Sequence, residues 1–212
     1  MITIEKLRFT PGSIAMNRGV ANGNTHTKER RFWLIELTDD QGRTALGEAA
    51  PWPGSGVSST DLGNATTVFS ENLVGRSFAI GSLLTEGWNP PTCTPAAACG
   101  IEQAILNLMA QDNGSTVESL LTETPQAHVQ THCLVDGPDT AKSAIERGVN
   151  ALKVKGGRDL QEDDERLAAI RTIAPSIRLR LDVNGAWSRE QAAASLDRLA
   201  RHELEWVEQP TP

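Results

Sequence analysis

Four charged residues of this 212-residue sequence have the types and the spacing needed for acid–base chemistry. Lys153 and Lys155 lie in the segment LKVKGG, Asp182 in RLDVNGAW and Glu208 in WVEQP. If LKVK is a strand, alternate residues share a face, so both lysines point to one side and the apolar residues point to the other. Such lysines at the end of a strand require a chemical explanation.

Two ammonium groups on one face repel each other and lose hydration, which is expected to lower the pKa of at least one lysine toward neutrality. Asp182 and Glu208 offer oxygen ligands of the kind that Mg²⁺ prefers. A lysine base beside a divalent cation suits removal of a proton next to a carboxylate, because the cation stabilises the second negative charge. Singly, a KxK strand or an Asp-x-Asn turn is usually structural, but together these segments favour a catalytic site.

The elements that must position these residues form a strand–helix alternation after residue 126. Lys155 and Asp182 are separated by 27 positions and Asp182 and Glu208 by 26, which is the length of one strand–helix unit. No GxGxxG turn follows the first strand, so we expect part of a (β/α) TIM-type barrel rather than an open nucleotide-binding sheet. A full eight-stranded barrel takes about 250 residues. Residues 126–212 are too few for it and have room for about four strands. The expected strands are 128–135, 151–155, 177–183 and 204–209, and the expected helices are 138–148, 159–173 and 188–202.

Residues 1–125 are expected to form a separate α+β domain. Alternating residues predict strands over 2–9, 31–38 and 44–49, and Thr94 followed by Pro95 predicts the start of a helix that stops at Asn113–Gly114. A weaker helix is expected over 59–74. The polar segment 17–30 and the segment 51–59 are expected to be loops that flank one cleft.

The segments LKVKGG, LRLDVNGAW and EWVEQP together resemble the enolase superfamily, in particular its muconate lactonizing subgroup and, within it, the o-succinylbenzoate synthases. GEAAPWPG, residues 47–54, is similar to a segment of that family's capping domain. The resemblance implies an α+β capping domain over 1–125, whose two loops close over a small carboxylate substrate, followed by the barrel domain over 126–212.

The resemblance also implies residue roles. Lys155 would be the acid/base, Lys153 would support the substrate carboxylate or the proton state of Lys155, and Asp182 and Glu208 would be two ligands of Mg²⁺. Asn184 and Trp52 are weaker candidates for contact with substrate or for support of the ligands. The family's third carboxylate ligand and opposing lysine would follow residue 212. We therefore expect a truncated chain that is impaired alone, tends to self-associate, and is completed, if at all, by another chain.

The implied reaction is a syn dehydration in menaquinone biosynthesis. Related families epimerise dipeptides, racemise N-succinylamino acids or cycloisomerise muconate, and they share the DVN and VEQP motifs, so the substrate stays open. A hypothesis from another class is an inactive fragment, which predicts that Lys155→Ala changes no phenotype.

Composition excludes several classes. The net charge of −7, without a basic run, argues against nucleic-acid binding. No apolar stretch approaches the length of about 20 residues that spans a bilayer, and the N-terminus does not resemble a leader, which predicts a cytoplasmic protein without membrane contact.

The remaining chemistry-bearing residues have structural interpretations. Cys93, Cys99 and Cys133 lack a zinc-binding spacing, and His128 and His132 would merely share a face of the strand expected over 128–135. Gly156–Gly157 indicates a turn more than a phosphate site, and the acidic run 162–165 is expected to stabilise a helix start and to face water. Core or loop packing is expected for the tryptophans, which include Trp33, Trp187 and Trp206.

Overall fold

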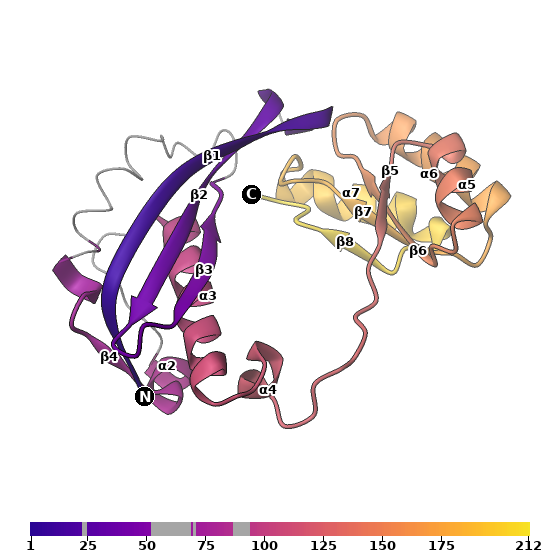
Figure 1. Cartoon of the computed structure of the whole chain (residues 1–212). Helices are drawn as coiled ribbons and strands as arrows, with labels where there is room; N and C mark the ends of the chain where they lie inside the picture. Colours follow the sequence, from indigo (N-terminus) through magenta and orange to yellow (C-terminus); the bar gives the residue numbers. More distant parts are fainter. Residues whose placement is uncertain (23–24, 52–68, 70, 87–93) are drawn as a thin grey trace. The chain divides into compact units, whose positions relative to one another are not determined.

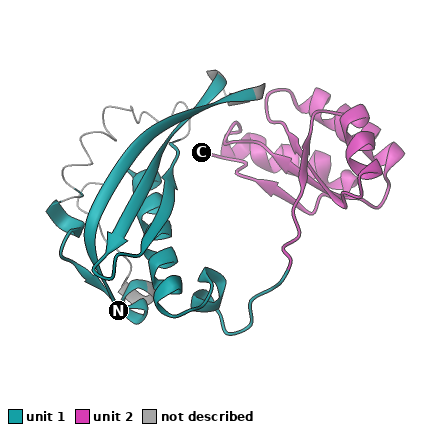
Figure 2. Ribbon diagram, in the orientation of Figure 1, with its two compact units in different colours: residues 1–127 teal, residues 128–212 magenta. Residues whose placement is uncertain are grey.

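A computed structural model of the chain describes residues 1–22, 25–51, 69, 71–86 and 94–212. It contains two compact units, Met1–Ala127 and His128–Pro212, which are coloured separately in Figure 2. Each unit has its own buried apolar cluster. The expected fold class, an α+β unit followed by alternating strands and helices with a parallel sheet, is confirmed.

The first unit is built on an antiparallel sheet with the order β3-β2-β1-β4. Its strands are β1 (Ile2–Asn22), β2 (Thr25–Asp39), β3 (Thr44–Ala49) and β4 (Ser77–Phe78). Figure 1 shows β1 and β2 as two long strands, which pair antiparallel. The short helices α2 (Ile80–Glu86) and α4 (Val117–Leu121), like β4, were not predicted.

The expectation of a loop over residues 17–30 is wrong, because β1 and β2 continue through most of it. Val20 pairs with Thr27 and Asn22 with Thr25, after a register shift beyond Ala15. Pairing gives the backbone groups of both arms hydrogen-bond partners, which outweighs the unfavourable strand propensity of Asn and Gly. Two expected elements lie mostly outside the described residues. Only Pro51 is described from the loop expected over 51–59, and only residues 69 and 71–74 from the helix expected over 59–74.

Helix α3 (Pro95–Asp112) covers the sheet of the first unit, at the position predicted. Thr94 caps it, since its side-chain oxygen accepts a hydrogen bond from the backbone N–H of Ala97 at 3.3 Å. Its fully buried side chains, which include Ile101 and Leu108, join Ile35 of β2 in the apolar cluster. The helix lies so close to β3 that a Cβ atom on Gly47 would collide with the carbonyl oxygen of Gly100.

The second unit alternates strands with helices around a parallel sheet of order β5-β6-β7-β8 (Figure 1). The strands are β5 (Cys133–Val135), β6 (Ala151–Lys155), β7 (Arg178–Asp182) and β8 (Trp206–Glu208). The helices are α5 (Pro138–Glu146), α6 (Leu160–Ile173), α7 (Arg189–Leu199) and the short η1 (Ala200–His202). Predicted and observed elements agree except at their ends. The largest difference is at β5, where residues 128–132 are not part of the strand.

Alternation along β6 and β7 divides their residues between the two faces of the sheet. Leu152, Val154, Leu179 and Leu181 belong to an apolar cluster that also contains Leu167 of α6. This face is therefore covered by helices. Lys153 and Lys155 alternate with the buried apolar residues and lie on the opposite face.

The expectation that the acidic run 162–165 faces water is wrong at two of its residues, Asp163 and Asp164, which are buried in the first turns of α6. Asp163 accepts a hydrogen bond from the backbone N–H of Gly157, and Asp164 contacts Arg198 of α7 and His202 of η1. Buried carboxylates are tolerated where such partners replace water.

Candidate active site

The two lysines and the two carboxylates form one hydrogen-bonded cluster on the second unit. Lys155 pairs in register with Asp182, and Asp182 pairs with Glu208, so β6, β7 and β8 bring these residues to one level. The ammonium group of Lys153 lies 2.8 Å from Asp182 Oδ2 and 2.8 Å from Glu208 Oε2. That of Lys155 lies 2.6 Å from Asp182 Oδ2. The carboxyl ends of three neighbouring parallel strands therefore assemble the predicted site residues.

Asn184 joins this cluster through the turn after β7. Its side-chain oxygen accepts a hydrogen bond from Lys155 Nζ at 2.7 Å, and its backbone N–H donates to Asp182 Oδ1 at 3.1 Å. The residue has a φ of 53°, a left-handed conformation that Asn adopts more readily than most residues. The turn is tied to the end of β8, because the N–H of Gly185 donates to the carbonyl of Gln209 at 2.7 Å. Asn184 thus contacts the proposed base directly.

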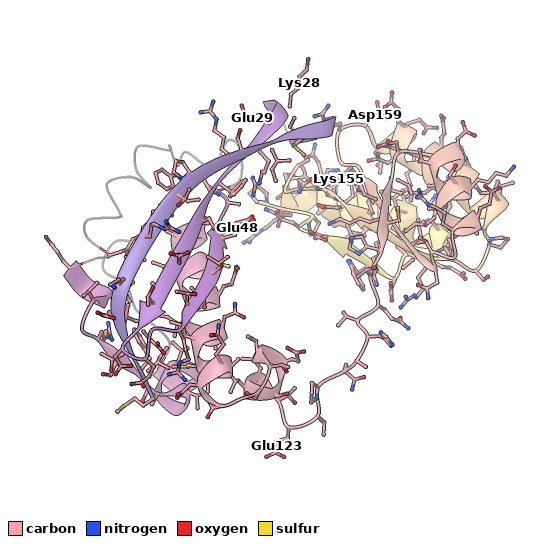
Figure 3. The ribbon with its side chains drawn as sticks, in the orientation of Figure 1. Lys28, Glu29, Glu48, Glu123, Lys155 and Asp159 are labelled. Atoms are coloured by element: carbon pink, nitrogen blue, oxygen red, sulfur yellow. The ribbon has the colours of Figure 1, made fainter. Side chains whose placement is uncertain are left out.

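Burial differs between the two lysines. The side chain of Lys153 is 12% exposed and that of Lys155 is 44% exposed, whereas Asp182 between them is 1% exposed. A ligand approaching this face of the unit would reach Lys155 more easily than Lys153. Figure 3 labels Lys155 at the end of β6.

The pKa of Lys153 is raised, so Lys153 is not the lysine whose pKa repulsion was predicted to lower. Desolvation lowers the pKa of Lys153, but its hydrogen bonds to Asp182 and Glu208 outweigh that effect and raise the pKa. Desolvation likewise raises the pKa of Asp182, and the hydrogen bonds from Lys153 and Lys155 outweigh it, so that the pKa falls. The prediction included the like charges and omitted the opposite charges that the same sheet brings in.

Asp182 and Glu208 fit the requirements of a divalent cation. One oxygen of each accepts from the same ammonium group at 2.8 Å, so the two carboxylates already converge on a single cationic group. Both are hard oxygen donors, the class that Mg²⁺ selects. Within the described part of the chain, no group of three or more His, Cys, Asp or Glu side chains is placed to hold a metal ion. Asp182 and Glu208 would thus supply a partial set of protein ligands.

A second polar cluster, not predicted from the sequence, lies on the strand face that carries Lys153. Arg180 pairs in register with Lys153. Its Nε donates to Glu205 Oε2 at 2.7 Å, its Nη1 lies 2.7 Å from His132 Nδ1, and its guanidinium stacks on Trp206 at 3.6 Å from the ring centre. The signal was present, because alternation in RLRLD puts Arg180 on the face of Asp182.

This cluster changes two expectations. His132 contacts Arg180 instead of sharing a strand face with His128. Desolvation is the main cause that lowers the pKa of His132, and the positive charges of Arg180 and Lys153 add to it. Trp206 is exposed and lies in strand β8 against the guanidinium of Arg180, so the expectation of core or loop packing is wrong for it.

The tryptophans and cysteines complete the set of residues considered from the sequence. Trp52 and Cys93 lie outside the described residues. Trp187 is buried and Trp33 packs against the first apolar cluster, as expected. Cys99 and Cys133 are free thiols. In the described ranges, no helix is both long and apolar enough to cross a membrane.

Comparison with known proteins supports the resemblance noted from the motifs. Residues 138–212 match the enolase C-terminal domain-like family. The chain is 29% identical over 187 residues to a hydrophobic dipeptide epimerase of Enterococcus faecalis, covering 84% of this chain and 52% of the relative. It is 27% identical over 221 residues to the o-succinylbenzoate synthase of Bacillus subtilis, covering 99% and 58%.

Solved structures give the same result. The dipeptide epimerase from Enterococcus faecalis V583, complexed with Mg and the dipeptide L-Leu-L-Tyr, matches with a TM-score of 0.86 and 25% identity, over 99% of this chain and 62% of that chain. The chain thus spans a little over half the length of the curated relatives it matches. The resemblance to enolase-superfamily enzymes is confirmed.

Proposed function

We propose that this chain, whose residues 138–212 match the enolase C-terminal domain-like family, supplies the acid–base lysine and two Mg²⁺ ligands of an o-succinylbenzoate synthase-type lyase. One observation carries the proposal: two ammonium groups and two carboxylates are hydrogen-bonded together at the carboxyl ends of β6, β7 and β8. Catalytic residues at these strand ends are the rule in barrels of this type. The proposal includes a cytoplasmic place in menaquinone biosynthesis.

Lys155 is the proposed acid/base. In its neutral form, Nζ accepts the proton from the carbon next to the substrate carboxylate, and the electron pair of that C–H bond stays on the substrate, shared between that carbon and its carboxylate. The same proton then passes to the hydroxyl group that leaves from the same side of the substrate. The C–O bond breaks, a carbon–carbon double bond forms, and one water molecule is lost without oxidation or reduction. The exposure of Lys155 and its contact with Asn184 suit this role.

Asp182 and Glu208 are the proposed Mg²⁺ ligands. Bound Mg²⁺ would supply electrostatic stabilisation of the negative charge that develops on the substrate carboxylate. Lys153 adds a positive charge beside both carboxylates and keeps them oriented toward the site. Asn184 and Trp52 are proposed to contact substrate or to support these groups.

Dipeptide epimerisation is a second candidate, because dipeptide epimerases match this chain at identities similar to those of the synthases. Racemisation of N-succinylamino acids belongs to the same candidate. The same lysine would remove the proton next to a carbonyl carbon in each case. The candidates differ in the second step, since a synthase expels hydroxide and an epimerase returns a proton to the carbon.

A substrate comparison distinguishes these candidates. The chain would be assayed with Mg²⁺ on the hydroxylated cyclohexadiene carboxylate that synthases dehydrate, and separately on L,L-dipeptides and N-succinylamino acids. The assay would be run on the chain alone and with the C-terminal remainder of the Bacillus subtilis synthase added. We expect dehydration to be the fastest reaction under at least one condition. Faster epimerisation or racemisation would replace the first proposal by the second.

A further inference from the structure

Asp163 has a buried carboxylate that the proposed reaction does not use. It belongs to the first turn of α6, where an acidic residue would ordinarily face water. Instead, its Oδ2 accepts a hydrogen bond from the backbone N–H of Gly157 at 2.6 Å, and its Oδ1 accepts from Arg166 Nη2 at 2.5 Å. The carboxylate is therefore directed to the turn that immediately follows Lys155.

That turn is built so that its backbone can approach the carboxylate closely. A Cβ atom on Gly156 would lie 2.7 Å from Asp163 Oδ2 and 2.7 Å from Leu181 Cδ1, so a side chain does not fit there. Gly157 has a φ of +96°, and a Cβ atom on it would lie 2.6 Å from Val183 Cγ1. Both positions require glycine, the residue without a Cβ atom.

The turn is also tied to β7. The N–H of Gly156 donates to the backbone carbonyl of Asp182 at 2.9 Å, while the N–H of Gly157 donates to Asp163. The two peptide groups after Lys155 are thus held by two different elements, one by the strand that carries a proposed metal ligand and one by α6. Figure 3 labels Lys155, directly before this turn, and Asp159, two residues after it.

Lys155 is the residue directly before this turn. Its side chain is more exposed than that of Lys153, and its ammonium group is held by Asp182 Oδ2 at 2.6 Å and Asn184 Oδ1 at 2.7 Å. Those contacts persist only if the end of β6 stays at its level in the sheet. Displacements of about 1 Å at a reacting group can reduce a rate about 100-fold.

We propose that Asp163 is a positioning residue for Lys155, which acts by fixing the Gly156–Gly157 turn from the side of α6. The inference rests on the proposed role of Lys155 as acid/base. Asp163 contributes to the reaction without touching substrate or metal.

Asp164 provides a matched control. It is the next residue of the same helix and is equally buried, but its partners are Arg198, Arg201 and His202, none of which belongs to the turn after Lys155. Asp163→Asn and Asp164→Asn each remove one buried negative charge from α6. Only the first weakens a contact to the Gly156–Gly157 turn.

The test compares the two variants by two readouts. For Asp163→Asn we expect kcat to fall about 10- to 100-fold with KM changed less than about threefold, whereas Asp164→Asn retains kcat. The second readout needs no catalysis: the rate of reductive methylation of Lys155, measured by mass spectrometry against exposed Lys142 of α5. We expect Asp163→Asn to raise the Lys155 to Lys142 ratio several-fold, and Asp164→Asn to leave it unchanged.

The outcomes separate this inference from the proposed function. Equal Lys155 to Lys142 ratios in the wild type and both variants would overturn the role of Asp163, as would equal changes in both variants. Absence of every assayed activity from the wild-type protein would overturn the proposed function, while the methylation ratio would still decide on Asp163.

A second variant keeps the inference testable if Asp163→Asn does not fold. Asp163→Glu retains the negative charge, but its longer side chain places the carboxylate differently against the N–H of Gly157. We expect it to raise the Lys155 to Lys142 ratio as well. A ratio equal to that of the wild type would contradict the inference.

Discussion

Replacing Asp164 by Asn should destabilise the second unit at neutral pH and have almost no effect in strong acid. Asp164 Oδ1 lies 2.6 Å from His202 Nε2, and Oδ2 accepts from Arg198 Nε at 2.9 Å and from Arg201 Nη2 at 2.5 Å. Desolvation raises the pKa of Asp164, but the hydrogen bonds from His202, Arg201 and Arg198 outweigh it and lower the pKa from 3.8 to about 2. The carboxylate form is therefore favoured by folding.

The sign and the size of the effect follow from this shift. A carboxyl group with a lowered folded-state pKa contributes its full stability above its unfolded pKa, and it loses that stability as the pH falls from about 4 to about 2. A fall from 3.8 to about 2 is equivalent to about 2.4 kcal/mol. Because Arg198 and Arg201 are exposed and solvent screens their charges, we expect about 1 to 2 kcal/mol.

Urea unfolding measures this contribution. The wild type, Asp164→Asn and the exposed-site control Asp197→Asn are compared by the fluorescence of buried Trp187. At pH 7 Asp164→Asn should be less stable than the wild type by about 1 to 2 kcal/mol, and Asp197→Asn should lie within about 0.5 kcal/mol of it. Near pH 2 the difference at Asp164 should largely disappear. Equal stabilities at pH 7, or a difference that persists unchanged at pH 2, would refute the assigned role of this carboxylate.

Three further predictions concern other parts of the chain. Gly47→Ala should lower the stability of the first unit by about 1 to 3 kcal/mol, because its Cβ atom would collide with Gly100. Gly81→Ala is the control and should not lower the stability, since its Cβ atom meets open space. Thermal unfolding compares the two variants. Thr94→Ala should cost about 1 kcal/mol through loss of the helix cap, measured the same way, and a smaller change than in an exposed-site control would contradict it. Asp182→Asn should weaken Mg²⁺ binding about 10-fold or more in a calorimetric titration, and unchanged affinity would remove Asp182 from the metal site.

The fold of the second unit was predictable because its signals are local and periodic. The strand over 151–155 has the bounds that the alternation in ALKVK indicates, and Asp159 and Ser188 cap the predicted helices through their side chains. The intervals between Lys155, Asp182 and Glu208 predicted that these residues lie at the ends of successive strands, as they do. Local periodicity was thus enough to predict that the two lysines and the two carboxylates of the candidate site lie together.

Burial of charge was not predictable in the same way, because it depends on partners distant in the sequence. Asp164 is buried only because residues 34 to 38 positions later supply its hydrogen bonds. Arg180 is buried because Glu205, directly before β8, and His132, directly before β5, both contact its guanidinium group. A sequence pattern shows that such residues are charged, but it does not show which partners the fold brings to them.

Lys155 and a divalent cation are both expected to be required for removal of the proton next to the substrate carboxylate. The measurement that tests it most directly is the dehydration rate of the cyclohexadiene substrate with the wild type and Lys155→Ala, each with Mg²⁺ and with EDTA, under the condition in which the wild type is most active. We predict turnover for the wild type with Mg²⁺ and a loss of about 100-fold or more on removal of either the lysine or the metal. Equal rates for the wild type and Lys155→Ala with Mg²⁺ would contradict the claim.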